Sequence, residues 1–255
     1  MAGAALPRRR VSDQRPILGP PIDAVNPVRT AWTVGRVITK ESPTRESVRL
    51  RMLVDDRQRH APGQHYLIRL RAPDGYTAQR SYSIASHDAD PLLEFLIERL
   101  PGGEVSEFIA DHAEVGDVLE LRGPIGRWFV WDGHTPAFCL VGGSGVVPAV
   151  AMVRTARRLS RAGRVAVVAV GRSPETLPYV EELRRAGASI AFTRHEDDQR
   201  PAGPPTRDEV LPLLGSAEIF YVCGSPRFAE YAESLLVDCG VDPSMIRVEQ
   251  FGATG

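Results

Sequence analysis

The chain has 255 residues, a formal net charge of -1 and 43% hydrophobic against 25% charged residues. This length is sufficient for two domains with a substantial core. The near-neutral charge offers no basic surface for nucleic acid or for coating a membrane, and no apolar run approaches the roughly 18 residues of a spanning helix. We therefore expect small or locally recognised partners, with no nucleic acid and no membrane among them.

Residues 1–27 contain Arg8-Arg9-Arg10 and five prolines. The arginines are not followed by the apolar run of roughly 7–15 residues that a secretory signal requires. We expect a disordered leader, whose basic triplet is either simply solvated or in contact with an acidic partner.

The cysteines Cys139, Cys223 and Cys239 are far apart and form no CxxC pair. A disulfide framework is not expected from them, nor are the four clustered thiolates of a plant-type iron–sulfur centre. We expect a cytoplasmic protein with no bound metal.

The first half, residues 28–133, reads as short strands separated by turns such as Pro62-Gly63 and Pro73-Asp74-Gly75. One short helix is expected at about residues 105–112. This spacing predicts a small antiparallel β-barrel. The six expected strands are residues 32–39, 47–53, 66–71, 81–86, 92–98 and 118–122.

The second half, residues 134–255, alternates apolar strands with helices, which predicts an α/β domain with a doubly wound parallel sheet. A crevice between two such domains is a common ligand site. The expected strands are residues 138–141, 165–170, 189–193, 219–223 and 245–251, and the expected helices are residues 148–161, 176–186, 207–214 and 227–239.

The most informative segment is Arg80-Ser81-Tyr82-Ser83-Ile84-Ala85-Ser86. On a strand, Arg80, Tyr82, Ile84 and Ser86 share one face and the other three residues share the opposite one. An arginine fork pairs with a pyrophosphate, a tyrosine lies against a flat ring, and a serine hydroxyl bonds a ring nitrogen. This is the set of groups that a flavin needs. A half-buried strand with a surface arginine explains the heptapeptide equally well.

A second motif, Gly142-Gly143-Ser144-Gly145, follows an apolar strand and opens a helix. Such glycines let backbone amides approach a phosphate, and the helix N-terminus adds a positive field. Pro148 suits a first helical turn, although it stands where a dinucleotide fingerprint has its third glycine. The alternative is a tight turn without a ligand.

Weaker signals come from three further places. The amides of Gly103, Glu104, Val105 and Ser106 could bind an anion, or merely cap a helix. Cys223-Gly224 and Glu249 close predicted strands, at the edge where open α/β sheets bind ligands. A core cysteine and a surface glutamate are the alternatives.

In their order along the chain, these motifs resemble the ferredoxin-NADP reductase superfamily, in particular its stand-alone FAD-binding oxidoreductases similar to bacterial oxygenase reductases without the iron–sulfur domain. Arg80-Ser81-Tyr82-Ser83 is similar to the flavin motif of that family, and residues 142–148 are similar to its nicotinamide-phosphate loop. Cys223-Gly224 resembles its nicotinamide-side motif. The resemblance covers about residues 30–255.

The resemblance implies an FAD-binding barrel followed by an NAD(P)-binding domain. Arg80 would neutralise the FAD pyrophosphate, Tyr82 would line the isoalloxazine, and Ser83 would bond near its reactive nitrogen. Gly103, Val105 and Ser106 would complete a phosphate cradle, while Cys223 and Glu249 would face the nicotinamide. Ser83, Cys223 and Glu249 are thus the expected catalytic residues.

The choice between NADPH and NADH depends on the segment after the strand at residues 165–170. Arg172 and Ser173 favour the 2′-phosphate of NADPH, whereas Glu175 favours the free ribose of NADH. Both cofactors stay open.

The implied function is electron transfer from NAD(P)H through FAD to a separate acceptor, such as a ferredoxin or an oxygenase component, because the four clustered cysteines of cluster-bearing reductases are missing. Two alternatives stay open: an NAD(P)H:flavin or small-acceptor reductase, and a non-catalytic subunit of a larger complex. The oligomeric state is not predicted.

Overall fold

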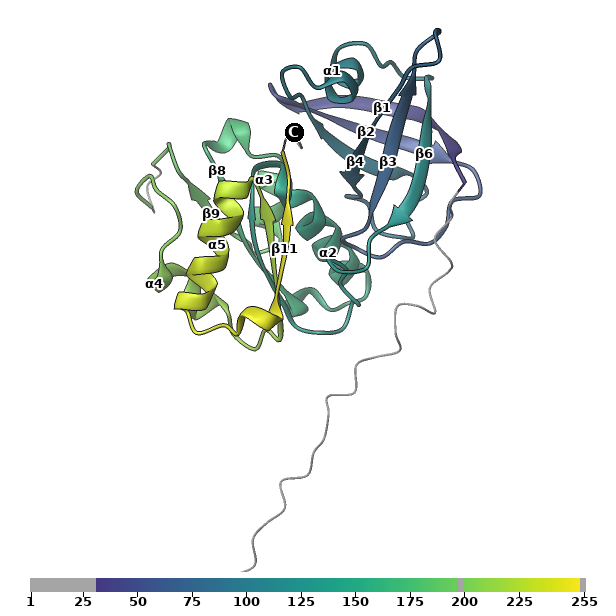
Figure 1. The fold of residues 1–255 in the computed structure, drawn as a ribbon. Coiled ribbons are helices and arrows are strands. Elements are labelled where there is room, and N and C mark those ends of the chain that lie inside the picture. Colours follow the sequence, from purple (N-terminus) through teal and green to yellow (C-terminus); the bar gives the residue numbers. More distant parts are fainter. Residues whose placement is uncertain (1–30, 197–199, 253–255) are drawn as a thin grey trace, which may run out of the picture.

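The computed structural model describes residues 31–196 and 200–252, so the leader expected at residues 1–27 lies outside the described part. An antiparallel sheet of six strands and a parallel sheet of five strands lie side by side (Figure 1). This arrangement confirms the expected fold class, a β-barrel followed by an α/β domain.

The antiparallel sheet has the order β4-β3-β6-β1-β2-β5. A bridge between Ile84 and Phe95, and a 2.8 Å hydrogen bond from the Ala85 N–H to the Glu94 carbonyl, join the ends of this order. The sheet is therefore closed into a barrel. Its strands are β1 (Thr33–Thr44), β2 (Ser47–Val54), β3 (His65–Arg71), β4 (Thr77–Ser83), β5 (Leu93–Glu98) and β6 (Val118–Ile125).

Alternation of side chains along these strands fills the barrel. On β2, Val48, Leu50, Met52 and Val54 point inward and are all buried. The helix α1 (Glu104–Asp111) packs Val105 and Ile109 into the same apolar cluster. The barrel core is thus built from the period-2 pattern that the sequence shows.

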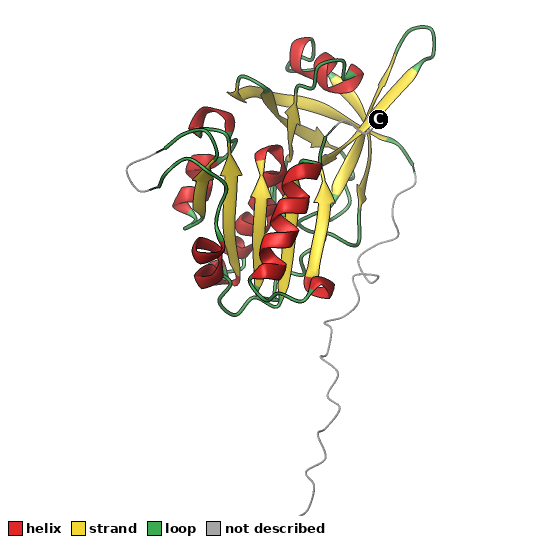
Figure 2. Ribbon diagram, turned by 60° about the vertical axis from the view of Figure 1, so that its left-hand side comes forward, coloured by secondary structure: helices red, strands yellow, loops and turns green. Residues whose placement is uncertain are grey.

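The parallel sheet has the order β11-β10-β7-β8-β9. Its central strand β7 is buried at every residue because helices cover both faces (Figure 2). Helices α2 and α3 belong to one apolar cluster, and α4 and α5 belong to the other. The elements are β7 (Ala137–Gly142), α2 (Val146–Arg158), β8 (Val165–Gly171), α3 (Val180–Arg185), β9 (Ser189–Phe192), α4 (Arg207–Val210), β10 (Ile219–Gly224), α5 (Pro226–Asp238) and β11 (Ile246–Gln250).

The two sheets share one apolar cluster. Ala85 and Leu96 from the barrel side pack in it with Cys139, Val146 and other residues of the α/β side. Trp131, in the connection between the sheets, is only 1% exposed, and its indole N–H donates to the Thr135 carbonyl at 2.8 Å. The domain boundary expected at residues 133 and 134 stays a prediction.

Some element boundaries differ from the expected ones. The strand expected at residues 81–86 is β4, which begins at Thr77 and ends at Ser83. Ile84, Ala85 and Ser86 turn into the interior and are all buried, so the alternation expected across the whole heptapeptide stops at Ser83.

The observed helices also differ from the expected ones at their ends. Helix α2 begins at Val146, which places Pro148 inside its first turn. The helix expected at residues 207–214 ends at Val210 and continues as a 3-10 turn over Leu211–Leu213, because Pro212 has no N–H to donate. In the described part of the chain, no helix is long and apolar enough to cross a membrane.

Candidate active site

The strand β4 presents an exposed cation. Among the described residues, Arg80 Nη1 donates only to the neighbouring Gln79 carbonyl, at 2.8 Å. No carboxylate within the described residues forms an ion pair with it. The guanidinium is therefore available to an anionic ligand such as a pyrophosphate.

Next to Arg80, an aromatic ring and a hydroxyl lie on the same strand. Tyr82 is opposite Tyr66 in the register, and burial raises the pKa of its phenol. Ser83 is 6% exposed and lies opposite His65, whose pKa burial lowers. Within the part of the chain that the structure describes, the Ser83 hydroxyl makes no hydrogen bond. The phenol stays protonated, and the serine hydroxyl remains free to bond a ring atom.

The N-terminus of α1 matches the expected phosphate cradle only in part. The Gly103 N–H already donates to the Leu100 carbonyl at 2.9 Å, and the Ser106 hydroxyl donates to the Gly103 carbonyl at 3.2 Å. Glu104 and Glu107 add negative charge to the first turn. The backbone amides of Glu104, Val105 and Ser106 are the remaining donors there, as at any helix start. The cradle role of Gly103, Val105 and Ser106 stays a prediction.

The glycine loop closes directly on the end of β10. A Cβ atom on Gly145 would lie 2.4 Å from the Cys223 carbonyl oxygen and 2.7 Å from the Gly224 nitrogen, so only glycine fits there. Gly143 has φ +58 and open space around it, which leaves its backbone accessible. The structure thus brings Gly142 and Gly145 together with Cys223 and Gly224.

Ser144 makes a different contact from the expected one. Its hydroxyl donates to Glu98 Oε2 at 2.6 Å, which ties the glycine loop to the last residue of β5 in the barrel. No motif in the sequence marks Glu98 as the partner of Ser144. The phosphate-binding role of Ser144 stays a prediction.

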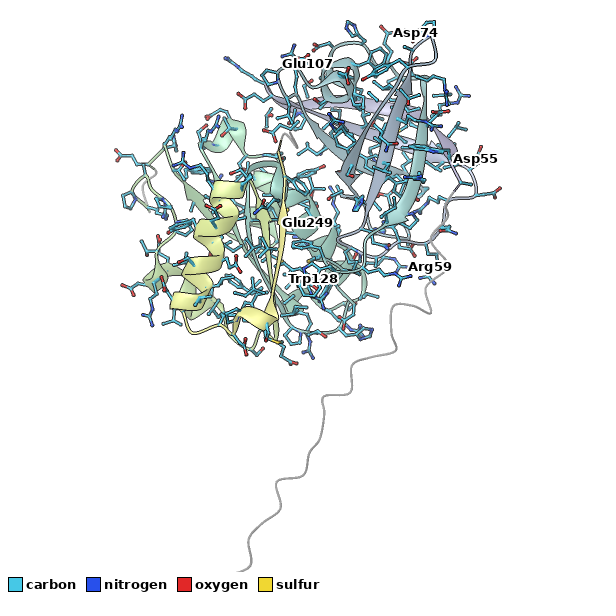
Figure 3. The ribbon with its side chains drawn as sticks, in the orientation of Figure 1. Asp55, Arg59, Asp74, Glu107, Trp128 and Glu249 are labelled. Carbon is cyan, nitrogen blue, oxygen red and sulfur yellow. The ribbon has the colours of Figure 1, made fainter. Side chains whose placement is uncertain are left out.

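Cys223 and Glu249 are register partners on β10 and β11. Burial raises the pKa of the Glu249 carboxyl to about 7, and its buried Oε2 has no hydrogen-bond partner among the described residues. Burial and the Glu249 charge also raise the pKa of the Cys223 thiol well above its ordinary value. Glu249 lies on the side of the parallel sheet that faces the barrel (Figure 3). A neutral thiol and a carboxyl able to titrate near neutrality thus lie side by side.

The segment after β8 leaves the nicotinamide preference open. Arg172 is exposed, while Ser173 caps the 3-10 turn Pro174–Thr176. A hydrogen bond from Ser173 holds the pKa of Glu175 below its ordinary value, so this carboxylate stays charged. An exposed arginine and a charged carboxylate are therefore both present in this segment.

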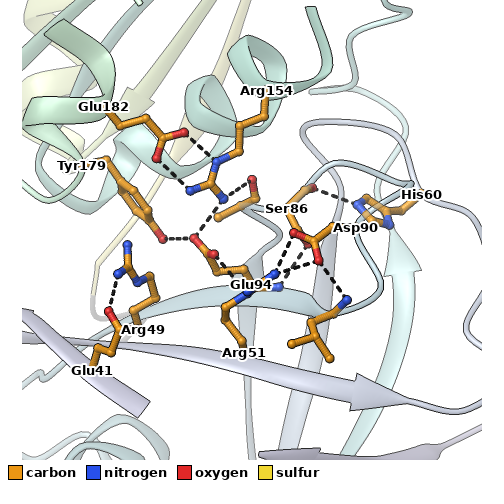
Figure 4. A network of polar contacts seen from close by, with 12 residues as sticks. Glu41, Arg49, Arg51, His60, Ser86, Asp90, Glu94, Arg154, Tyr179 and Glu182 are labelled. Atoms are coloured by element: carbon orange, nitrogen blue, oxygen red, sulfur yellow. Dashed lines mark hydrogen bonds and ion pairs between the residues drawn. The ribbon is translucent and has the colours of Figure 1, made fainter. Parts of the chain in front are cut away.

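Sequence reasoning missed a polar network where the two sheets meet (Figure 4). Arg154 of α2 donates to Glu94 of β5 at 2.9 Å, and the Tyr179 hydroxyl donates to the same Glu94 oxygen at 2.9 Å. The partners are 60 and 85 residues apart in sequence. No local pattern marks residues that meet only after folding.

The residues present fit both expected cofactors. Among the described residues, Arg80 has no anionic partner and the Ser83 hydroxyl has no hydrogen bond, so these two groups and the Tyr82 ring would be available to FAD. Glu249, opposite Cys223, has a carboxyl oxygen with no hydrogen-bond partner among the described residues, and the Gly143 loop leaves its backbone open to a nucleotide phosphate. The weak point of the fit is the acidic first turn of α1.

Comparison with known proteins agrees with this geometry. Residues 35–130 match the family model of the oxidoreductase FAD-binding domain. The reductase component (ferredoxin–NAD(P)+) of the naphthalene 1,2-dioxygenase system of Pseudomonas putida is 28% identical over 85% of this chain and 68% of its own length. The propane 2-monooxygenase reductase component of Mycolicibacterium goodii is 32% identical over 84% of this chain and 66% of its own length.

Among solved structures, a ferredoxin NADP+ reductase from Neisseria gonorrhoeae with bound FAD and NADP superposes with a TM-score of 0.73. The superposition covers 86% of this chain and 98% of the reductase chain, at 18% identity. It therefore supports the fold alone. Fold and site together define an oxidoreductase with an FAD-binding barrel and a nicotinamide-binding α/β domain. The chain belongs to the ferredoxin-NADP reductase superfamily.

Proposed function

We propose that this chain is an NAD(P)H-dependent flavoprotein reductase that passes electrons through FAD to a separate acceptor, such as a ferredoxin or an oxygenase component. The observation that carries the proposal is the pairing of two half-sites. The barrel offers Arg80, Tyr82 and Ser83 on one strand, and the α/β domain offers Cys223 beside Glu249. The named relatives are reductase components of oxygenase systems, which supports a protein acceptor.

When bound, FAD would supply the redox chemistry, which converts hydride donation by NAD(P)H into transfer of single electrons. The chain supplies the geometry. Arg80 binds the pyrophosphate charge, Tyr82 orients the ring, and Ser83 bonds a ring nitrogen. The Gly143 loop would admit the nucleotide, and Cys223 with Glu249 would hold the nicotinamide. A cytoplasmic location is part of the proposal, since the acceptor systems of such reductases are expected where NAD(P)H is regenerated.

The test is an anaerobic titration of the FAD-loaded protein with NADH and NADPH in parallel, followed by flavin absorbance. Bleaching by one or both nucleotides supports the proposal and decides the cofactor preference. Purified protein that neither contains FAD nor takes it up would contradict it.

Two other outcomes distinguish the alternatives. Faster turnover with free flavin than with ferredoxins indicates a flavin or small-acceptor reductase. FAD that stays oxidised with both nucleotides indicates a non-catalytic subunit.

A further inference from the structure

The Arg154 guanidinium forms hydrogen bonds to residues of both domains. We propose that Arg154, together with Tyr179, is a positioning residue for electron transfer: by binding Glu94 and the Ala85 carbonyl, it sets the orientation of the α/β domain on the barrel. The proposal rests on the function proposed above, because orientation matters when a donor on one domain must meet an acceptor on the other.

The contacts of the Arg154 guanidinium divide between the two domains. Its Nε and Nη2 donate to the two carboxylate oxygens of Glu182 on α3, at 2.7 and 2.8 Å. Its Nη1 crosses to the barrel, where it donates to Glu94 Oε1 at 2.9 Å and to the Ala85 carbonyl at 3.1 Å. One planar group thus fixes distances on both sides of the interface.

Each end of this contact lies on a segment that adjoins one of the two half-sites. Ala85 lies two residues after Ser83, at the point where the chain that carries the flavin strand turns into the interior. Arg154 lies on α2, the helix that the glycine loop opens. A movement of α2 relative to β4 would therefore have to break the Arg154 contact.

The network lies largely out of solvent, and its positively and negatively charged side chains alternate. The Glu94 side chain is only 6% exposed, and it faces Arg154 as well as Arg51, whose Nε lies 3.6 Å away. Asp90 pairs with Arg51 at 2.7 Å. Removing one member of such a network leaves a buried charge uncompensated, so the arrangement tolerates few alternative geometries.

Tyr179 extends the network to the segment expected to contact the adenosine ribose. Its φ is 60, a left-handed conformation that is rare for a bulky residue. The hydroxyl donates to Glu94, and the Arg154 guanidinium lies 5.4 Å from the ring centroid. Such a backbone conformation persists where its surroundings hold it. The same loop carries Arg172 and Ser173.

Apolar packing alone would not set the angle. The shared cluster with Trp131 and Phe129 holds the domains together, but hydrophobic contact is non-directional. The hydrogen bonds of Arg154 are directional. Hydride transfer depends on donor and acceptor atoms held at the correct distance and angle, so a small rotation slows it while binding persists.

The first experiment compares Arg154→Lys, Arg154→Gln and Tyr179→Phe with the wild type. The control is Arg158→Gln, which removes an exposed arginine from the same helix. FAD content, the KM for the nucleotide and the stopped-flow rate of flavin reduction are measured. We expect Arg154→Gln to slow reduction by about 100-fold and Tyr179→Phe by about 10-fold, with FAD content and KM within about twofold of wild type. Arg154→Lys should fall between wild type and Arg154→Gln, and the control should match wild type.

The second experiment measures the domain arrangement without using activity. Spin labels on Arg45→Cys, in the β1–β2 turn, and Glu230→Cys, on α5, report the distance between the domains, and the native cysteines are all buried. We expect one narrow distance distribution in the parent protein and a broader or shifted one after Arg154→Gln.

An unchanged distribution in Arg154→Gln overturns the proposal, whatever the reduction rates. A slower rate that comes only with loss of FAD overturns it too, because the residue would then be purely structural. If neither nucleotide reduces the parent flavin, the proposed function fails, while the label distances still decide the role of Arg154 in domain orientation.

Discussion

Folding changes the acid–base chemistry of Glu249. Its carboxyl lies beside the buried Cys223 of β10, where desolvation raises its pKa from 4.5 to about 7. Between these two values the folded chain holds a proton that the unfolded chain has released. The contribution of Glu249 to stability is therefore complete below about pH 4.5 and is lost as the pH rises through about 7.

The corresponding prediction compares the wild type with Glu249→Gln, which cannot ionise. From about pH 5.5 to about pH 8.5, the free energy of unfolding of the wild type should fall by about 2 kcal/mol relative to that of the variant. Urea unfolding at the two pH values measures this difference, and all other titrating groups cancel in the comparison. A difference that is the same at both pH values would show that Glu249 ionises normally.

Arg80 is an exposed cation on β4. Because no carboxylate among the described residues neutralises it, a bound pyrophosphate would receive its full charge. Arg80→Ala should raise the dissociation constant of FAD about 10- to 100-fold, as expected for a lost charge-assisted hydrogen bond. Flavin fluorescence on titration measures this change. Arg45→Ala, on the exposed β1–β2 turn, is the control, and equal affinities in the two variants would remove Arg80 from the flavin site.

At the scale of elements, the important junction is the one between the glycine loop and the end of β10. Gly145 lies so close to the Cys223 and Gly224 backbone that a methyl group cannot enter without moving one of the two segments. The loop and the strand end are therefore packed as one unit, and the position of Cys223 depends on this packing.

Gly145→Ala should lower the free energy of unfolding by about 1–3 kcal/mol, as overpacking usually does, and should weaken nucleotide binding. Gly163→Ala is the matched control because a Cβ atom there meets nothing within 4 Å, so its stability should stay within about 0.5 kcal/mol of wild type. Urea unfolding and nucleotide titration of both variants provide the measurement. Equal stabilities would mean that the loop moves freely away from β10.

For the whole molecule, the shared apolar cluster predicts that the two domains unfold together. Trp131 lies in that cluster, between the sheets, and is 1% exposed. Trp131→Ala should cost about 3–5 kcal/mol, the range for a buried aromatic side chain.

The control for this prediction is Trp128→Ala. Trp128 is 62% exposed and contacts Arg247 only through its ring face at 5.5 Å, so its loss should cost no more than about 1 kcal/mol. Calorimetry measures both variants. Two well-separated transitions in the wild type would show that the domains are independent folding units.

The sequence by itself determined the two-domain architecture, the barrel and parallel strands, and the glycine turns. These features depend on local causes: the period of side chains along strands and helices, and the backbone freedom of glycine. For the same reason, the sequence alone could group Arg80, Tyr82 and Ser83, because the three residues are close together on one strand.

Only the tertiary structure decided which residues meet across the domains. Glu98 and Ser144 are 46 residues apart, and Glu94 and Tyr179 are 85 apart, so no local pattern pairs them. The end of β4 at Ser83 was decided in the same way, because closure of the barrel draws Ile84 to Phe95. The raised pKa of Glu249 also depends on burial by distant segments, and burial is a property of the folded molecule rather than of the residue.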